Sequence, residues 1–280
     1  HTDDKQVLEL FQRIKKDCGK LDILVNNVFQ TPSDPSLDIT SSPANSNDIL
    51  FKSFWDQPGW FWDTFMNIGL RSHYIASCYA FPLLKHTKEL NPTASPLIVH
   101  ISSFGGVSYS FNVAYGVGKA GVDRMARDMA LELTSYGINC VSLYPGVVRT
   151  ERMVDILESG EFRKRTNLAI PKEFIETPLF TGRVIASFYD ALDKKSVSSQ
   201  TYNGKSIVVA ELARILGVVD VSGCTPPSLR SVRFLLPSLL LNQFKIPPKQ
   251  LENILIKITP DVLLPMSFME GGPPEASKSM

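Results

Sequence analysis

The sequence lacks any apolar run close to the roughly 20 residues that a membrane-spanning helix needs. It also lacks a charge excess, because 29 lysines and arginines stand against 28 aspartates and glutamates, for a net charge of +1. Proteins that bind nucleic acid usually carry a basic surplus. A spanning helix and a nucleic-acid partner are therefore not expected.

Cysteine is scarce and scattered along the chain. The four cysteines are Cys18, Cys78, Cys140 and Cys224, and no two of them form a Cys-x-x-Cys pair. Zinc sites and disulfide frameworks usually need cysteines at close or repeated spacing. We therefore expect no metal site, reduced thiols and a cytoplasmic protein.

What the sequence does contain is an alternation of helical and strand patterns. Asp3–Cys18 has apolar residues at three-to-four residue spacing, Gly19 favours a helix end, and Leu21–Val25 is a short apolar strand. The same order recurs at 60–88 with 97–101, at 115–136 with 139–144, and at 178–192 with 205–210. This alternation predicts a doubly wound α/β fold, a parallel sheet with helices on both faces.

Two stretches depart from this alternation. Residues 30–58 are rich in Pro, Ser, Asn and Asp and predict a loop insertion. Residues 225–280 contain many prolines, a leucine-rich patch and a polar ending that we expect to be disordered. We therefore predict a partial Rossmann-like catalytic domain at 1–224 and a C-terminal extension at 225–280.

Polar or turn residues follow three of the predicted strands, at Asn26–Asn27, Ser102–Ser103 and Pro145–Gly146. The carboxyl ends of parallel strands meet at one edge of a sheet, where open α/β folds bind their ligands. The sequence therefore predicts a functional site at this edge.

Tyr115 and Lys119 are the most informative pair of residues. They lie one helical turn apart, so the phenol and the ammonium can share one pocket. A nearby ammonium lowers a tyrosine pKa from about 10 and suits the phenol to acid–base catalysis. Ser103 precedes Tyr115 by twelve residues at a strand end and could donate a hydrogen bond to a substrate oxygen. An exposed Tyr and Lys on an ordinary helix, and a serine in a turn, are the alternatives.

The order of strand, serines, glycines, Tyr-x-x-x-Lys helix, strand and Pro-Gly resembles the short-chain dehydrogenase/reductase family. The resemblance covers residues 1 to about 224 and is strongest at Leu97–Thr150. It implies that Tyr115 is the general acid/base and that Lys119 binds the nicotinamide ribose and lowers the tyrosine pKa. It also implies that Ser103 orients the substrate, with Ser102 as the alternative.

Further site residues follow from the same resemblance. Asn67 would hold a water in a proton relay to the lysine. Asn26 begins Asn-Asn-Val-Phe, which is similar to the family's Asn-Asn-Ala-Gly with its last two positions changed, and would support the sheet beside the cofactor adenosine. Pro145 and Gly146, through to Thr150, would contact the nicotinamide and the pyrophosphate.

Within the family, the chain resembles a subgroup of NADPH-dependent carbonyl reductases that accept ketones, including steroids. The segments that carry this resemblance are Phe54–Pro58, Phe111–Val113, Tyr115–Lys119 with its Gly118, and Leu236–Ser238. The resemblance therefore implies NADP(H) rather than NAD(H) and a small carbonyl substrate. It also implies a homodimer and association with the endoplasmic reticulum. The patch 232–241 could contact a membrane interface or a dimer partner, or pack over the substrate pocket. A sugar-nucleotide epimerase or dehydratase, and a non-catalytic form that acts only by dimerising, are the alternative functions.

One expected feature is missing from the sequence. Dinucleotide binding needs a glycine-rich turn between a strand and a helix, and no such turn follows an opening strand here. By the logic of the fold, the front of the domain lacks on the order of 60 residues, at about 30 per βαβ unit. We therefore expect the chain to be N-terminally truncated, to bind NADPH poorly by itself and to be inactive alone.

Overall fold

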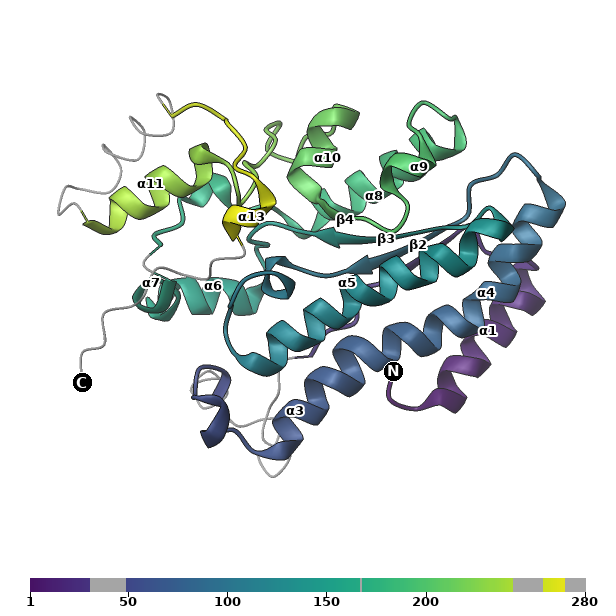
Figure 1. The fold of residues 1–280 in the computed structure, drawn as a ribbon, viewed down its shortest axis with the longest axis horizontal. Helices are drawn as coiled ribbons and strands as arrows, with labels where there is room; N and C mark the ends of the chain where they lie inside the picture. The colour runs from purple at the N-terminus through teal and green to yellow at the C-terminus, as the bar shows by residue number, and fades with distance from the viewer. Residues whose placement is uncertain (31–48, 167, 244–258, 270–280) are drawn as a thin grey trace. The chain divides into compact units, whose positions relative to one another are not determined.

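A parallel sheet forms the centre of the fold (Figure 1). The computed structural model describes residues 1–30, 49–166, 168–243 and 259–269. The sheet has the order β1-β2-β3-β4, with bounds Ile23–Asn26, Leu97–Ile101, Asn139–Tyr144 and Ser206–Val208. β1 pairs with β2 and β2 pairs with β3, both in parallel, so that Asn26 lies opposite His100 and Ile101 opposite Leu143. The predicted α/β fold with a parallel sheet is confirmed.

The chain divides into two compact units, His1–Tyr144 with Phe188–Ile207, and Pro145–Ser187 with Val208–Met280. The helices of the first unit are α1 (Asp4–Cys18), η1 (Phe54–Asp56), α3 (Gly59–Met66), η2 (Asn67–Arg71), α4 (Ser72–Leu90), η3 (Phe104–Gly106), α5 (Val113–Leu133), η4 (Thr134–Tyr136) and α9 (Ser199–Tyr202). Those of the second are α6 (Glu151–Glu158), α7 (Glu161–Thr166), η5 (Lys172–Phe174), α10 (Val209–Leu216), α11 (Val232–Gln243) and α13 (Met266–Met269). α8 (Pro178–Asp193) has residues in both units. The domain boundary predicted at residue 224 stays a prediction.

The predicted opening helix is present and capped at both ends. The Asp3 side chain accepts hydrogen bonds from the backbone N–H groups of Lys5 and Gln6, which have no partner inside the helix. At the other end Gly19 adopts a left-handed conformation with φ 73°, and its N–H donates to the carbonyls of Ile14 and Lys15. The helix end predicted at Gly19 is therefore confirmed, while Asp3, predicted as the first helical residue, is the N-cap.

The helix predicted at 60–88 is interrupted by a π-helical turn. α3, η2 and α4 run on from one another between Gly59 and Leu90. In η2 the N–H of Ser72 donates to the carbonyl of Asn67, five residues earlier, instead of the usual four. Such turns often occur at functional sites, and this one begins at the predicted relay residue.

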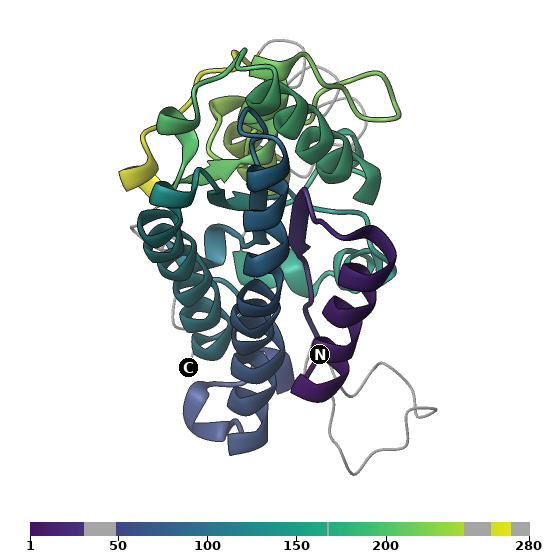
Figure 2. The same ribbon diagram turned by 90° about the vertical axis from the view of Figure 1, so that its right-hand side faces the viewer.

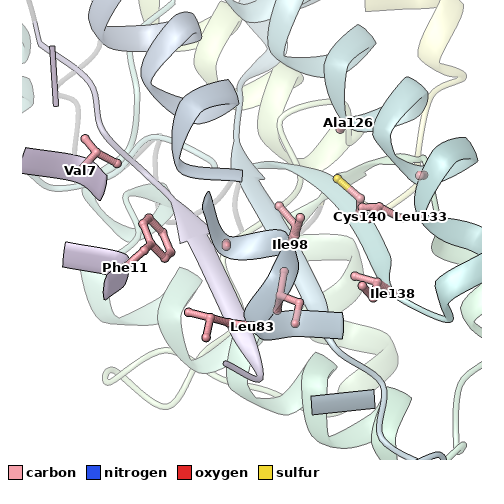
Figure 3. Packing of buried hydrophobic residues seen from close by; sticks show 11 residues of the cluster. Val7, Phe11, Leu83, Ile98, Ala126, Leu133, Ile138 and Cys140 are labelled. Carbon is pink, nitrogen blue, oxygen red and sulfur yellow. The ribbon is translucent and has the colours of Figure 1, made fainter. Parts of the chain in front are cut away.

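The core of the first unit lies where α1, α4 and α5 pack together on the sheet (Figure 3). The views in Figures 1 and 2 both place α4 beside α5. The buried residues are Val7, Phe11, Ala80, Leu83, Leu84, Ile98, Ala126, Ala130, Leu133, Ile138 and Cys140. Burial of apolar area on this scale fixes α5 against β2 and β3, and it is α5 that carries the Tyr-x-x-x-Lys motif.

The last predicted strand is shorter than expected. β4 ends at Val208, and Val209 and Ala210, predicted as strand, begin α10 instead. Val209, Ala210, Leu212 and Ala213 are buried at helical spacing. A short apolar run cannot be told from the start of a buried helix by periodicity alone.

The described part of the C-terminal extension packs into the second unit. Phe234 of α11 is buried with Val147 and Phe174. The Arg230 guanidinium donates to both carboxylate oxygens of Glu211, at 2.7 and 2.6 Å. The predicted disordered ending at 270–280, and residues 31–48 of the predicted loop insertion, lie outside the described residues. None of the helices within the described ranges is long and apolar enough to cross a membrane.

Truncating Leu84 to alanine should destabilise the protein by about 2–5 kcal/mol, because the side chain is fully buried and its loss leaves a cavity. Leu90→Ala on the same helix is the matched control: Leu90 is 62% exposed, so its loss should cost no more than about 0.5 kcal/mol. Urea unfolding of both variants measures the difference. Equal losses would contradict the assigned core.

Candidate active site

The phenol of Tyr115 meets the hydroxyl of Ser103. Asn112 caps α5, and its side chain accepts the N–H of Tyr115 at 2.9 Å, which places the tyrosine in the first turn. Ser103 follows β2, and its Oγ lies 2.7 Å from the Tyr115 Oη. A Cβ on Gly105 would lie 2.3 Å from the tyrosine ring, so only glycine fits beneath it. Ser102 instead turns its hydroxyl to the Lys119 carbonyl, at 3.2 Å.

Lys119 is buried one helical turn after Tyr115 on α5. Its ammonium donates to the carbonyl of Ile101 at 3.0 Å, and Nζ lies 5.1 Å from the centroid of the Phe29 ring. An ammonium has three N–H donors, and the Ile101 carbonyl is its one hydrogen-bond acceptor among the described residues. Two donors therefore remain for a ligand.

The expected lowering of the Tyr115 pKa is wrong for this conformation. Burial of the phenol raises its pKa, and the charge of Asp123 raises it further, against the hydrogen bond of Ser103, which lowers it. Burial also lowers the pKa of Lys119 to about 8, while Asp123 opposes that change. With a pKa of about 8 the lysine keeps most of its charge at neutral pH, but its charge is not among the causes that shift the Tyr115 pKa.

Aromatic rings enclose the tyrosine. Phe29, Phe65 and Phe111 meet the Tyr115 ring nearly edge-on, with centroids 5.8, 6.0 and 5.1 Å away. They leave a cavity of about 10 Å³, which is about the space of one water molecule. Its lining residues are Phe29, Phe65, Gly69, Tyr115, Gly118 and Lys119. At this volume the cavity has no room for a nicotinamide or a substrate beside Lys119 while the rings keep these positions.

Phe29 is the ring best placed to move. It is 43% exposed, whereas Phe65 is 2% exposed and belongs to a buried cluster. The sequence identified Phe29 only as a departure from the Asn-Asn-Ala-Gly pattern. Its role as the cover of Lys119 depends on the path of the chain after β1, for which the sequence gives no signal.

Asn67 lies at the start of η2 and is exposed. Within the described ranges, no hydrogen bond joins its side chain to Lys119. Its neighbours make the contact with α5 instead: a Cβ on Gly118 would lie 3.6 Å from Met66, and one on Gly121 would lie 2.9 Å from Leu70. The relay function of Asn67 stays a prediction.

Asn26 holds the end of β1 to its neighbours. Its buried amide donates to the Ser77 hydroxyl at 3.0 Å and lies 3.3 Å from Nδ1 of His100. The rings of His73 and His100 stack at 5.6 Å, and burial lowers their pKa values to about 4 and about 3, so both are neutral at physiological pH. Asn26 thus supports the sheet edge, while its contact with a cofactor stays a prediction.

Pro145, Gly146 and Thr150 belong to the second unit. Thr150 caps α6, and its hydroxyl accepts the Met153 N–H at 3.2 Å. Glu176 holds the segment between them: its N–H donates to the Val147 carbonyl at 2.9 Å, and its carboxyl group accepts the N–H of Gly146.

Glu176 is fully buried, and this burial raises its pKa to about 7. Its Oε2 has no hydrogen-bond partner among the described residues. Sequence reasoning missed Glu176, because Glu-Thr-Pro is typical of the start of a helix and carries no sign of burial.

The parallel sheet and the Ser-Tyr-Lys group together define a Rossmann-fold oxidoreductase. A family profile described as enoyl-(acyl carrier protein) reductase matches residues 1–191. The chain belongs to the short-chain dehydrogenase/reductase family. The family predicted from the motifs is therefore confirmed.

Three comparisons show the range of similar proteins. Human dehydrogenase/reductase SDR family member 1 is 34% identical over 226 residues, which cover 79% of this chain and 65% of the human protein. The 7alpha-hydroxysteroid dehydrogenase of Paraclostridium sordellii is 26% identical over 213 residues, 75% of this chain and 72% of that enzyme. The structure of ElxO with NADP bound matches with a TM-score of 0.55 at 25% identity, covering 74% of this chain and 73% of that one. The chain thus spans less than two thirds of its human relative.

Replacing Glu176 by glutamine should change how stability depends on pH. The folded-state pKa of about 7 lies above the usual 4.5, so the stability tied to the protonated acid is complete below pH 4.5 and is lost as the pH rises through 7. Glutamine does not titrate, so the variant should gain roughly 3 kcal/mol relative to the wild type between pH 4.5 and 8. Urea unfolding across this range measures the gain. The exposed Glu173→Gln serves as control, and parallel curves for E176Q and wild type would refute the assignment.

Replacing Phe29 by alanine should make Lys119 more reactive. The Phe29 ring contacts the Tyr115 ring and the Lys119 ammonium, and these contacts together hold it over the lysine by about 1–2 kcal/mol. Their loss should therefore raise the rate of reductive methylation at Lys119 about tenfold. Mass spectrometry of peptides gives the rate. The control Phe54→Ala removes a ring that is 61% exposed and should leave the rate unchanged. An unchanged rate in F29A would show that Phe29 does not cover the lysine.

Proposed function

We propose that this protein is an NADP(H)-dependent oxidoreductase that reduces the carbonyl group of a ketone, steroid ketones included, to an alcohol. The observation that carries the proposal is the 2.7 Å contact of Ser103 with Tyr115, beside the buried ammonium of Lys119. The proposal of a steroid substrate rests on the resemblance to carbonyl reductases and on the name of the Paraclostridium relative. The proposal of NADP as the cofactor rests on the same resemblance and on ElxO, whose structure has NADP bound.

The described residues carry groups that suit the nicotinamide half of such a cofactor, which needs more room than the present cavity of about 10 Å³ provides. Lys119 has two unused N–H donors for ribose hydroxyls. Gly69 and Gly118 line the cavity without side chains. When bound, the reduced nicotinamide supplies the hydride. Pro145, Gly146 and Thr150 are the proposed contacts to the carboxamide and the pyrophosphate, and Asn26 the support beside the adenosine.

Ser103 and Tyr115 would bind the substrate oxygen together. Each hydroxyl has one proton to donate, and a carbonyl oxygen has two lone pairs to accept them. The raised pKa of Tyr115 keeps the phenol protonated at neutral pH, which is the form that a reduction requires. As negative charge develops on the carbonyl oxygen, Tyr115 transfers its proton to that oxygen.

Lys119 would stabilise the phenolate that this transfer leaves. The ammonium and the phenol lie one helical turn apart beside the Phe29 ring, and a charge acts more strongly at such a partly buried site than in bulk water. Asn67 lies at the π-helical turn. It is proposed to hold a water molecule that takes part in returning a proton to the site.

The exposed part of the leucine-rich patch 232–241 is proposed to contact a membrane interface or a dimer partner. Phe234 is 3% exposed in the core of its own unit, and Leu236 is 40% exposed. A homodimer and association with the endoplasmic reticulum are further proposals that rest on the resemblance alone.

Tyr115→Phe should reduce the rate of ketone reduction by about 10²–10⁴-fold, because the proton donor is lost while the ring packing is kept. The rate is measured in the full-length protein with the expected glycine-rich turn, as oxidation of NADPH or NADH with a panel of steroid and aliphatic ketones, because the present chain alone is expected to be inactive. Tyr109→Phe, at a tyrosine that is 60% exposed, should keep full activity. Full activity in Y115F, or no ketone-dependent oxidation by the full-length wild type, would overturn the proposal.

A further inference from the structure

A third polar side chain follows Tyr115 and Lys119 along α5. Asp123 lies one more helical turn along, so the phenol, the ammonium and the carboxylate share one side of the helix. The carboxylate is held in place from two sides. The Tyr144 hydroxyl donates to its Oδ2 at 2.6 Å, and η3 passes so close that a Cβ on Gly106 would lie 2.4 Å from the same oxygen.

The charged and titratable groups around Lys119 single out this carboxylate. Tyr115 and Asp123 lie on the same side of α5 as the lysine. His73 of α4 is neutral, and the charge of Lys119 contributes to lowering its pKa. Tyr144 of β3 faces Asp123 and stays protonated because burial raises its pKa, and Arg127 lies near Tyr144. Asp123 is thus the negative group among them.

We propose that Asp123 is a positioning residue for the reaction: its carboxylate keeps the buried Lys119 ammonium charged without occupying the donors that a ligand needs. This role rests on the proposed function. No direct ion pair joins the two side chains within the described residues, and the ammonium bonds the Ile101 carbonyl instead. A carboxylate in direct contact would take up N–H groups, whereas one a turn away leaves them free.

The physical reason is the cost of burying an ammonium. A buried lysine tends to lose its proton unless a negative charge lies near it. Lys119 is 7% exposed, and the Asp123 charge opposes the effect of its burial. Burial raises the pKa of Asp123 itself, and the hydrogen bonds of Tyr144, Ser102 and Ser142 and the charge of Lys119 oppose this rise by favouring the charged carboxylate.

The test replaces Asp123 by asparagine, which removes the charge but keeps an oxygen for the Tyr144 hydroxyl. Lysines are dimethylated with ¹³C-formaldehyde, and the Lys119 signal, assigned by its loss in Lys119→Arg, is followed against pH. The pKa of Lys119 should fall by about one unit in D123N. Asp123→Ser, also uncharged, serves in its place if D123N does not fold.

Two controls separate charge from structure. Asp128→Asn removes an exposed carboxylate of the same helix, paired with Arg124, and should leave the Lys119 titration unchanged. Tyr144→Phe removes the hydrogen bond but keeps the Asp123 charge, so it should shift the titration less than D123N does. An unshifted Lys119 pKa in D123N, or equal shifts in D123N and D128N, would overturn the proposal.

A second readout links the charge to catalysis. The rate of ketone reduction should fall as the pH rises through the Lys119 pKa, and in D123N this fall should begin about one unit lower. A wild type without ketone reduction would refute the proposed function alone, because the Lys119 titration still decides the role of Asp123. An unmoved pH profile in an active D123N would refute the positioning role.

Discussion

The ammonium of Lys119, buried where β2 ends, is the constraint on which the rest of the site depends. A charge removed from water needs acceptors and a negative partner. The Ile101 carbonyl supplies an acceptor at the end of the strand, Asp123 supplies the charge, and Phe29 places its ring over the cation. The end of β2, the helix α5 and the segment after β1 therefore each contribute one contact or charge to the Lys119 ammonium.

The position of that group is set by packing remote from it. Ala126, Ala130 and Leu133 anchor the far part of α5 in the core, and Asn112 fixes its first turn. Gly105 and Gly106 let η3 approach so closely that Ser103 reaches Tyr115. Apolar burial thus provides the rigidity, and two glycines provide the short distances on which the hydrogen bonds depend.

The sequence was informative where structure is local. Residue types and periodicity predicted the end of α1 at Gly19, the bounds of β2 and β3, and the one-turn spacing of Tyr115 and Lys119, and the structure has them. Choosing Ser103 over Ser102 needed the direction of each side chain after β2. Phe29, Asp123 and Glu176 could not be found in this way, because their roles arise from residues distant in sequence.

Burial also explains why the predicted direction of the Tyr115 pKa was wrong. Spacing along a helix predicts which charges are near, but not how much water is removed around them. Here the same burial raises the pKa of the phenol above its usual 10.0 and lowers that of the ammonium from 10.5 to about 8, so the two values move apart. The phenol therefore stays protonated beside the lysine at neutral pH, which is the form that the proposed reduction needs. A ligand can use that proton only where the Phe29 ring makes room for it, because the cavity beside Tyr115 has a volume of about 10 Å³.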